Sequence, residues 1–257
     1  MELLDEVNRR GLTPTAVTYS TLFNGYDKEG RPRKGLALMK RMKQRGCAPD
    51  YISYMTLLQG LLNGGEVTLG LKVYSEMEKQ GLRVDERTMN SLLRKVCREA
   101  YIDEKMFTES CLIVEKMKSW GYTIFPDTYC RFIQTLCFWE RFDAALDALT
   151  LMVRTGKFPS MVTIDRVIRA LCQDGRTREA LSVFALIRET SRTPSKRSYR
   201  RLIDGLGEQG YVLVAFSVYA TAVKQGITGA KDHFESSKIE APEMKRCKNE
   251  SQRTTQP

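Results

Sequence analysis

Residues suited to covalent or metal chemistry are scarce in this chain. Its 257 residues include one histidine, His233, and seven cysteines that form no Cys-x-x-Cys pair. Zinc and haem sites need such clustered ligands, and a Ser/His/Asp triad or a zinc deaminase needs a histidine beside its partners. No glycine-rich loop leads into Lys-Ser/Thr to hold a phosphate. We therefore expect no enzymatic activity, no cofactor, no metal and no small-molecule substrate.

Three cysteines share one position in a repeating pattern and are flanked by helix-forming residues. They are Cys97, Cys137 and Cys172. A small apolar side chain suits a helix interface, so these cysteines are predicted to be core residues. Free thiols also predict a reducing compartment.

The elements that must position the polar side chains follow from an internal repeat. Between Ala16 and Ala230 the sequence resembles itself about every 35 residues, which is typical of stacked-repeat proteins. Six copies are expected, at 16–50, 51–85, 86–125, 126–160, 161–195 and 196–230, and the third has about five extra residues. Residues 1–15 are similar to the second half of an earlier copy, so the chain is expected to begin within a repeat. Residues 231–257 lose the apolar pattern and are predicted to be disordered.

Each copy is predicted to form two antiparallel helices. In the fifth copy the first apolar stripe, at helical spacing, is Ile164, Val167, Ile168 and Leu171, and the second is Ala180, Leu181, Phe184 and Ile187. Glycines fifteen residues into a copy predict the end of the first helix, at Gly30, Gly65, Gly175 and Gly210. The second helix is expected to end near Gly46, Gly81, Gly121, Gly156 and Gly226.

Two short helices cannot bury their apolar surface alone, so neighbouring pairs must stack. The sequence therefore predicts an all-α protein, a right-handed α-solenoid of stacked antiparallel helix pairs, with the first helices lining a concave groove. No apolar run is long enough to span a membrane.

The net charge is a second clue to the partner. It is +10, and residues 231–257 hold six Lys/Arg against five Asp/Glu, so the excess belongs to the repeats. A polyanion such as RNA fits this charge, although basic solvated faces that favour solubility are an open alternative. Eight Lys/Arg fall in the first copy, and most are expected on its second helix as a solvated face.

The repeats resemble the pentatricopeptide repeat (PPR) family, in its plain class of repeats near 35 residues. The resemblance covers residues 1–230 and is carried by Val17-Thr18-Tyr19-Ser20-Thr21-Leu22, Gly30-Arg31, Pro49-Asp50, Val162-Thr163, Gly175-Arg176 and Glu179-Ala180-Leu181. The 34-residue tetratricopeptide repeat fits less well, because its Trp/Leu-Gly/Tyr pattern is missing.

The resemblance implies single-stranded RNA binding, with about one base per repeat. In the family, the fifth residue of a repeat meets the base edge, the last residue supports that choice, and the second residue helps to sandwich the base. The first copy offers Ser20 and Asp50 with Val17, a combination that favours guanine in the family. It is the best-matching copy.

The same alignment implies further candidate RNA contacts in the other copies. They are Met55 with Asp85 and Ile52, Asn90 with Phe125, Cys130 with Ser160, Asp165 with Ser195 and Val162, and Arg200 with Ala230. Asn90 fits a pyrimidine, whereas the other four pairs have no recognisable code. A readable target longer than two or three bases is therefore not expected. Asp50 and Asp85 could equally act as N-caps of the helices that follow them. The inward polar residues could instead be solvated without a ligand.

The function implied by the resemblance is that of an RNA-binding adaptor for transcripts of a mitochondrion or chloroplast, acting in processing, stabilisation or translation. No presequence is recognisable at the start of the chain. Two alternatives stay open. One is a helical-repeat scaffold that binds protein partners in an organellar ribonucleoprotein, and the other is a truncated, degenerate copy of a longer protein.

Overall fold

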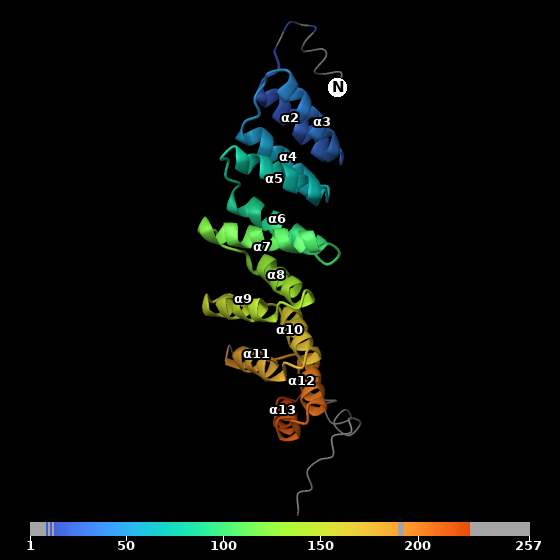
Figure 1. Cartoon of the computed structure of the whole chain (residues 1–257), viewed down its shortest axis with the longest axis vertical. Coiled ribbons are helices and arrows are strands. Elements are labelled where there is room, and N and C mark those ends of the chain that lie inside the picture. Colours follow the sequence, from blue (N-terminus) through green and yellow to red (C-terminus); the bar gives the residue numbers. More distant parts are fainter. Residues whose placement is uncertain (1–8, 10, 12, 190–192, 227–257) are drawn as a thin grey trace, which may run out of the picture. The chain divides into compact units, whose positions relative to one another are not determined.

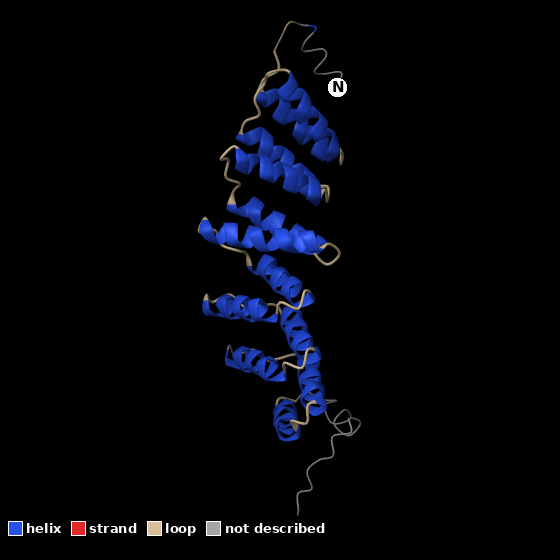
Figure 2. Ribbon diagram, viewed as in Figure 1, coloured by secondary structure: helices blue, strands red, loops and turns tan. Residues whose placement is uncertain are grey.

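The computed structural model describes residues 9, 11, 13–189 and 193–226. The predictions for Ala230 and for the tail at 231–257 lie outside this part, and so does most of the half-repeat at 1–15. The described residues form helices and no strand (Figure 2). None of their helices is long and apolar enough to cross a membrane.

Twelve described helices alternate as first and second members of six pairs (Figure 1). The first helices are α2 (Ala16–Lys28), α4 (Tyr51–Asn63), α6 (Glu86–Glu99), α8 (Pro126–Phe138), α10 (Met161–Gln173) and α12 (Lys196–Glu208). The second helices are α3 (Pro32–Gln44), α5 (Val67–Lys79), α7 (Glu104–Ser119), α9 (Phe142–Arg154), α11 (Thr177–Glu189) and α13 (Val212–Lys224). Each first helix begins on the first residue of a repeat copy.

The chain divides into two compact units, Met1–Pro159 and Ser160–Pro257. In the first unit α2, α4, α6 and α8 contact one another in succession, and each also contacts its own second helix. In the second unit α10 contacts α11 and α12, and α12 contacts α13. Each unit is therefore a stack of helix pairs, and the prediction of an all-α solenoid is confirmed.

The predicted stripes form the core. All four apolar residues of the first stripe of the fifth copy are buried, as are Ala180, Phe184 and Ile187 of the second, whereas Leu181 is half-buried. Cys97 and Cys137 are buried, and Cys172 is half-buried. Burial raises the pKa of the Cys97 thiol to about 12 and that of Cys172 to about 11, so both stay protonated at neutral pH. Their burial agrees with the prediction that these cysteines are core residues.

Left-handed residues end the helices where the glycine pattern predicted them. Gly30, Gly65, Gly175 and Gly210 have φ between 68° and 78°, values that cost glycine little. The fourth copy carries Glu140 at the same position, with φ 56°, and it is the one non-glycine residue with positive φ among those described. The glycine pattern does not predict this turn, because the fourth copy has no glycine at the position.

The extra length of the third copy lies in its helices and in the turn between them. Helix α6 has 14 residues and α7 has 16, against 13 in α2. At the junction with the fourth copy, Phe107 stacks on Trp139 at 5.5 Å between ring centroids. The Trp139 indole donates a hydrogen bond of 2.7 Å to the Ala100 carbonyl. Because the extra residues lie before the end of α7, Phe125 directly precedes the next first helix, α8, as the last residues of the other copies do.

Candidate nucleic-acid interface

Three apolar residues predicted to stack on bases lie in the first turns of first helices. Val17 on α2, Ile52 on α4 and Val162 on α10 are 74%, 61% and 66% exposed. Large apolar side chains this exposed bury little surface within the protein, so they are available to a flat apolar ligand. Their contact with RNA stays a prediction.

The last residues of the copies cap the helices that follow. Asp50 accepts a hydrogen bond of 2.8 Å from the amide of Ser53, and Asp85 accepts one of 2.9 Å from the amide of Thr88. Ser160 and Ser195 accept in the same way from the amides of Thr163 and Ser198. The predicted capping role of Asp50 and Asp85 is therefore confirmed. Phe125 occupies the same position without a side-chain cap and is 40% exposed.

A buried hydroxyl at the third position of a copy connects the candidate residues of the copy before it. The Ser53 hydroxyl lies 3.1 Å from the Ser20 hydroxyl. The Ser53 amide donates a hydrogen bond to the Asp50 carboxylate. In the second unit the Ser198 hydroxyl donates to Asp165, and the Ser195 hydroxyl donates to the same carboxylate at 2.7 Å. The fifth and last residues of the first and fifth copies are thus held in one hydrogen-bonded set.

Sequence reasoning missed these third-position residues, although a signal was present. A Ser or Thr stands there in all six copies: Thr18, Ser53, Thr88, Thr128, Thr163 and Ser198. The last five are at most 4% exposed. A recurrent hydroxyl on an otherwise apolar stripe indicates a buried polar group with a fixed partner.

The first copy presents acceptors at its surface. The Ser20 hydroxyl donates to the Ala16 carbonyl at 3.0 Å, which leaves its oxygen as an acceptor. The polar side chain and the amide of Ser53 lower the pKa of Asp50, so its exposed carboxylate is ionised at neutral pH. Ser20 itself is half-buried.

Three predicted base-contacting residues are buried instead. Met55 and Cys130 are 8% and 7% exposed, and Asn90 is 2% exposed. The Asn90 amide donates to the carbonyls of Glu86 (3.0 Å) and Thr123 (2.9 Å), and its oxygen accepts from the Phe125 amide at 2.7 Å. Since Asn90 already holds the segment before α8, a base could reach it only by breaking these bonds.

The fifth and sixth copies differ from the first in charge. The Asp165 carboxylate is half-buried beneath two serine hydroxyls, and the Arg201 guanidinium donates to the Asp165 carbonyl at 3.0 Å. Arg200, at the fifth position of the sixth copy, is exposed.

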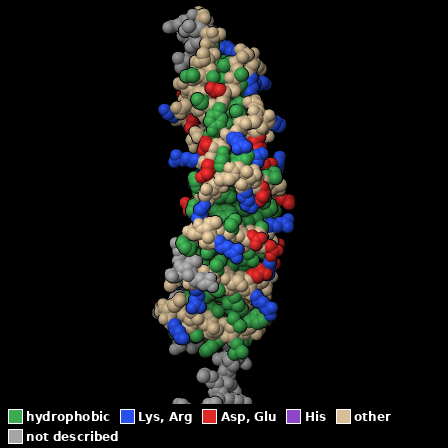
Figure 3. Space-filling view, turned by 90° about the vertical axis from the view of Figure 1, so that its left-hand side faces the viewer, with side chains coloured by type: hydrophobic (Ala, Val, Ile, Leu, Met, Phe, Trp, Pro, Cys, Tyr) green, Lys and Arg blue, Asp and Glu red, His purple; other side chains and the backbone are tan. Residues whose placement is uncertain are grey.

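Much of the basic cluster of the first copy lies on its second helix, α3, as expected. Arg33 pairs with Glu66 at 2.6 Å, Lys43 pairs with Glu76, and in the next copies Lys116 on α7 pairs with Glu78 on α5 at 2.8 Å. On the face shown in Figure 3, basic and acidic side chains are interspersed with apolar ones. These ion pairs are consistent with a solvated face rather than a ligand site.

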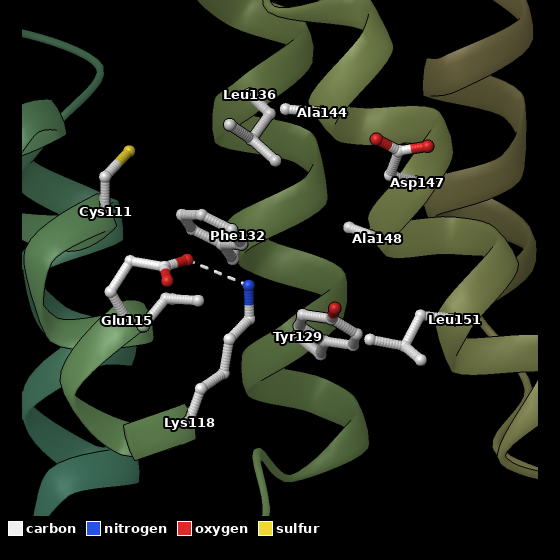
Figure 4. Close-up of a pocket in the computed structure, with 11 residues that line it drawn as sticks. Cys111, Glu115, Lys118, Tyr129, Phe132, Leu136, Ala144, Asp147, Ala148 and Leu151 are labelled. Atoms are coloured by element: carbon white, nitrogen blue, oxygen red, sulfur yellow. Dashed lines mark hydrogen bonds and ion pairs between the residues drawn. The ribbon is translucent and has the colours of Figure 1, made fainter.

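A pocket of about 270 Å³ opens between α7, α8 and α9. Figure 4 shows Glu115 and Lys118 of α7 facing Tyr129 and Phe132 of α8, with Leu151 of α9 on the other side. The Lys118 ammonium and the Glu115 carboxylate form an ion pair at 2.8 Å. No group of three His, Cys, Asp or Glu side chains suited to a metal occurs in the part of the chain that the structure describes.

Comparison with known proteins identifies the family. The PPR repeat family model matches residues 14–63 and 49–98, and a second PPR repeat model matches 162–189. The chain is a pentatricopeptide repeat protein. The crystal structure of PPR10 from maize superposes on it with a TM-score of 0.50 at 25% identity, covering 88% of this PPR protein and 36% of PPR10.

Two Arabidopsis thaliana structures share the fold at lower identity. The PPR domain of PRORP1, in complex with tRNA, gives a TM-score of 0.56 at 15% identity, covering 69% of this PPR protein and 93% of that domain. Nuclear proteinaceous RNase P 2 (PRORP2) gives 0.59 at 11%, covering 66% of this chain and 37% of its own. No curated protein matches the sequence.

Proposed function

We propose that this PPR protein binds single-stranded RNA and that its first copy selects guanine through Ser20 and Asp50. The observation that carries the proposal is the hydrogen-bonded set Ser20, Ser53 and Asp50 beside the exposed Val17. In this copy alone, a hydroxyl at the fifth position and a carboxylate at the last are joined in this way.

The chemistry of the set fits guanine. The Watson–Crick edge of guanine presents N–H donors, and an ionised carboxylate with a hydroxyl acceptor beside it can receive them. Val17 supplies apolar surface against the base plane. Adenine presents an acceptor where guanine has an N–H, so it would face Asp50 with an unfavourable contact. The PRORP1 PPR domain, of the same fold, was crystallised in complex with tRNA, which supports RNA as the class of ligand.

The buried fifth-position residues limit the expected readout. Met55, Asn90 and Cys130 offer no exposed polar group, so copies two to four contribute little base selection. The expected preference is short and centred on the first copy. We further propose that the RNA is an organellar transcript, which the protein protects, remodels or presents to another factor, and that the protein resides in a mitochondrion or chloroplast. These two points rest on the family resemblance, and a fluorescent fusion of the full-length protein tests the compartment.

The test of readout uses matched cap variants. Fluorescence anisotropy with single-stranded RNAs that differ at one base measures guanine preference for the wild type, Asp50→Asn and Asp85→Asn. Asparagine caps helices as well as aspartate, so the fold is kept. We expect Asp50→Asn to reduce the preference roughly tenfold, the loss of about 1–2 kcal/mol. Asp85→Asn should leave it unchanged, because Met55 beside Asp85 is buried. Equal behaviour of both variants would contradict guanine reading by Asp50.

A protein scaffold is the second candidate, and α13 favours it. Leu213, Phe216 and Val223 of this helix are 73%, 43% and 52% exposed. Exposed apolar side chains gathered on one helix are suited to a protein partner. If the purified protein does not bind RNA but retains a stable partner after nuclease treatment, the scaffold function replaces the proposed one.

A further inference from the structure

The sixth copy carries arginine where the first carries its candidate base contacts. Arg197 is the second residue of the copy and Arg200 the fifth, the positions of Val17 and Ser20 in the first copy. They lie three residues apart on α12 and therefore share one face of that helix. Both side chains are exposed.

Neither arginine is neutralised by the residues that the structure describes. Arg197 and Arg200 form no hydrogen bond or ion pair within them, whereas Arg176 of the same unit pairs with Glu179 at 2.7 Å. Across the helix interface, the Asp165 carboxylate on α10 already accepts hydrogen bonds from two serine hydroxyls. The charge of the two guanidinium groups is thus available to a ligand.

The neighbouring helix adds to this charge. Arg169 lies on α10, which packs against α12, and it is exposed without a described partner. Together α10 and α12 hold six Lys/Arg and three Asp/Glu, whereas α2 and α4 hold one Lys and one Asp. The first helices of the first two copies are therefore electrically neutral, and those of the second unit are basic.

We propose that Arg197 and Arg200 bind the phosphate backbone of RNA, so that the sixth copy anchors the strand without reading a base. The proposal rests on the proposed RNA-binding function and names the part of the ligand that this copy contacts. A guanidinium keeps its charge and donates in a planar fork that matches phosphate oxygens. Base reading in the first copy uses a second polar residue at the end of the copy, and the sixth ends in Ala230, whose side chain has no polar atom.

Two charge-matched double variants test the proposal. Arg197→Ala/Arg200→Ala removes the proposed contacts, and Lys34→Ala/Lys40→Ala removes two exposed charges from α3. Affinities for RNAs of different base content are measured over a range of salt concentrations. Each phosphate contact on a single strand contributes about 0.7 to the slope of log affinity against log salt. We expect the arginine variant to lower the slope by about 1.4, with the same loss for every sequence. The lysine variant should lower it much less.

The conservative variant separates phosphate binding from base reading. Arg197→Lys/Arg200→Lys keeps the charges and should restore most of the salt slope. Arginine can also contact guanine through two hydrogen bonds, which lysine cannot reproduce with the same geometry. A loss confined to one base, or not rescued by lysine, would overturn phosphate anchoring. So would an arginine variant that binds like the wild type while the guanine preference of the first copy persists, and the proposed function would then stand alone. If the wild type binds no RNA, both proposals fail.

Discussion

Replacing Glu140 by glycine is expected to stabilise the first unit. Glu140 has φ 56°, and the turn it makes is closed by a hydrogen bond of 2.9 Å from the Arg141 amide to the Leu136 carbonyl. Its exposed side chain makes no hydrogen bond or ion pair with the described residues. Glutamate therefore contributes strain there without a compensating contact.

The size of the effect follows from two opposing terms. A side chain in the left-handed region costs roughly 1–2 kcal/mol. Glycine loses more freedom on folding, which costs about 0.5–1 kcal/mol. The difference predicts a stabilisation of about 0.5–1 kcal/mol for Glu140→Gly.

Urea unfolding followed by tryptophan fluorescence measures this change in the relevant unit. The only tryptophans, Trp120 and Trp139, both lie in the first unit, and Trp139 directly precedes Glu140. With a slope of about 2 kcal/mol per molar urea, the midpoint should rise by about 0.25–0.5 M. Glu140→Ala is the control, because it removes the charge and keeps the Cβ atom. If both variants raise the midpoint equally, the charge rather than the backbone is the cause. A lower midpoint for Glu140→Gly would mean that Glu140 contributes no net backbone strain.

Two further predictions concern capping and the ion pairs between copies. Asp50→Ala should lower stability by about 1 kcal/mol, whereas Asp50→Asn should lower it little, as urea unfolding at neutral pH would show. Because folding lowers the pKa of Asp50, the stability that its carboxylate adds is complete above the ordinary value of about 3.9 and is lost as pH falls through the folded value. The stability difference between wild type and Asp50→Ala should therefore shrink in acid, and a difference that does not change with pH would contradict this cause. A double-mutant cycle on Lys116 and Glu78 should give a coupling of about 0.2–1 kcal/mol that disappears at high salt, and a coupling insensitive to salt would mean that it is not electrostatic.

The fold was largely predictable because its local rules repeat. Left-handed turn positions favour glycine, so Gly30 and its counterparts marked helix ends in sequence. Glu140 shows the limit of this rule, because the fourth copy makes the same left-handed turn with a residue other than glycine. The insertion in the third copy was visible as extra length, but its division among α6, the turn and α7 depends on packing around Trp139.

The candidate site was predictable only in part. The caps at Asp50 and Asp85 followed from residue type and position. The burial of Met55 and Asn90 did not, because the exposure of a fifth-position side chain is set by the following copy and linking segment. Ser53 was overlooked because its role is a contact across copies, which its own copy does not reveal.

We propose that the first copy of this RNA-binding repeat protein selects guanine through Ser20 and Asp50. The most direct measurement is the ratio of affinities for two single-stranded RNAs that differ by guanine or adenine at one base. We predict a ratio well above one for the wild type and for Asp85→Asn, and a ratio about tenfold smaller for Asp50→Asn. Tight binding with the same ratio in all three proteins would contradict the claim.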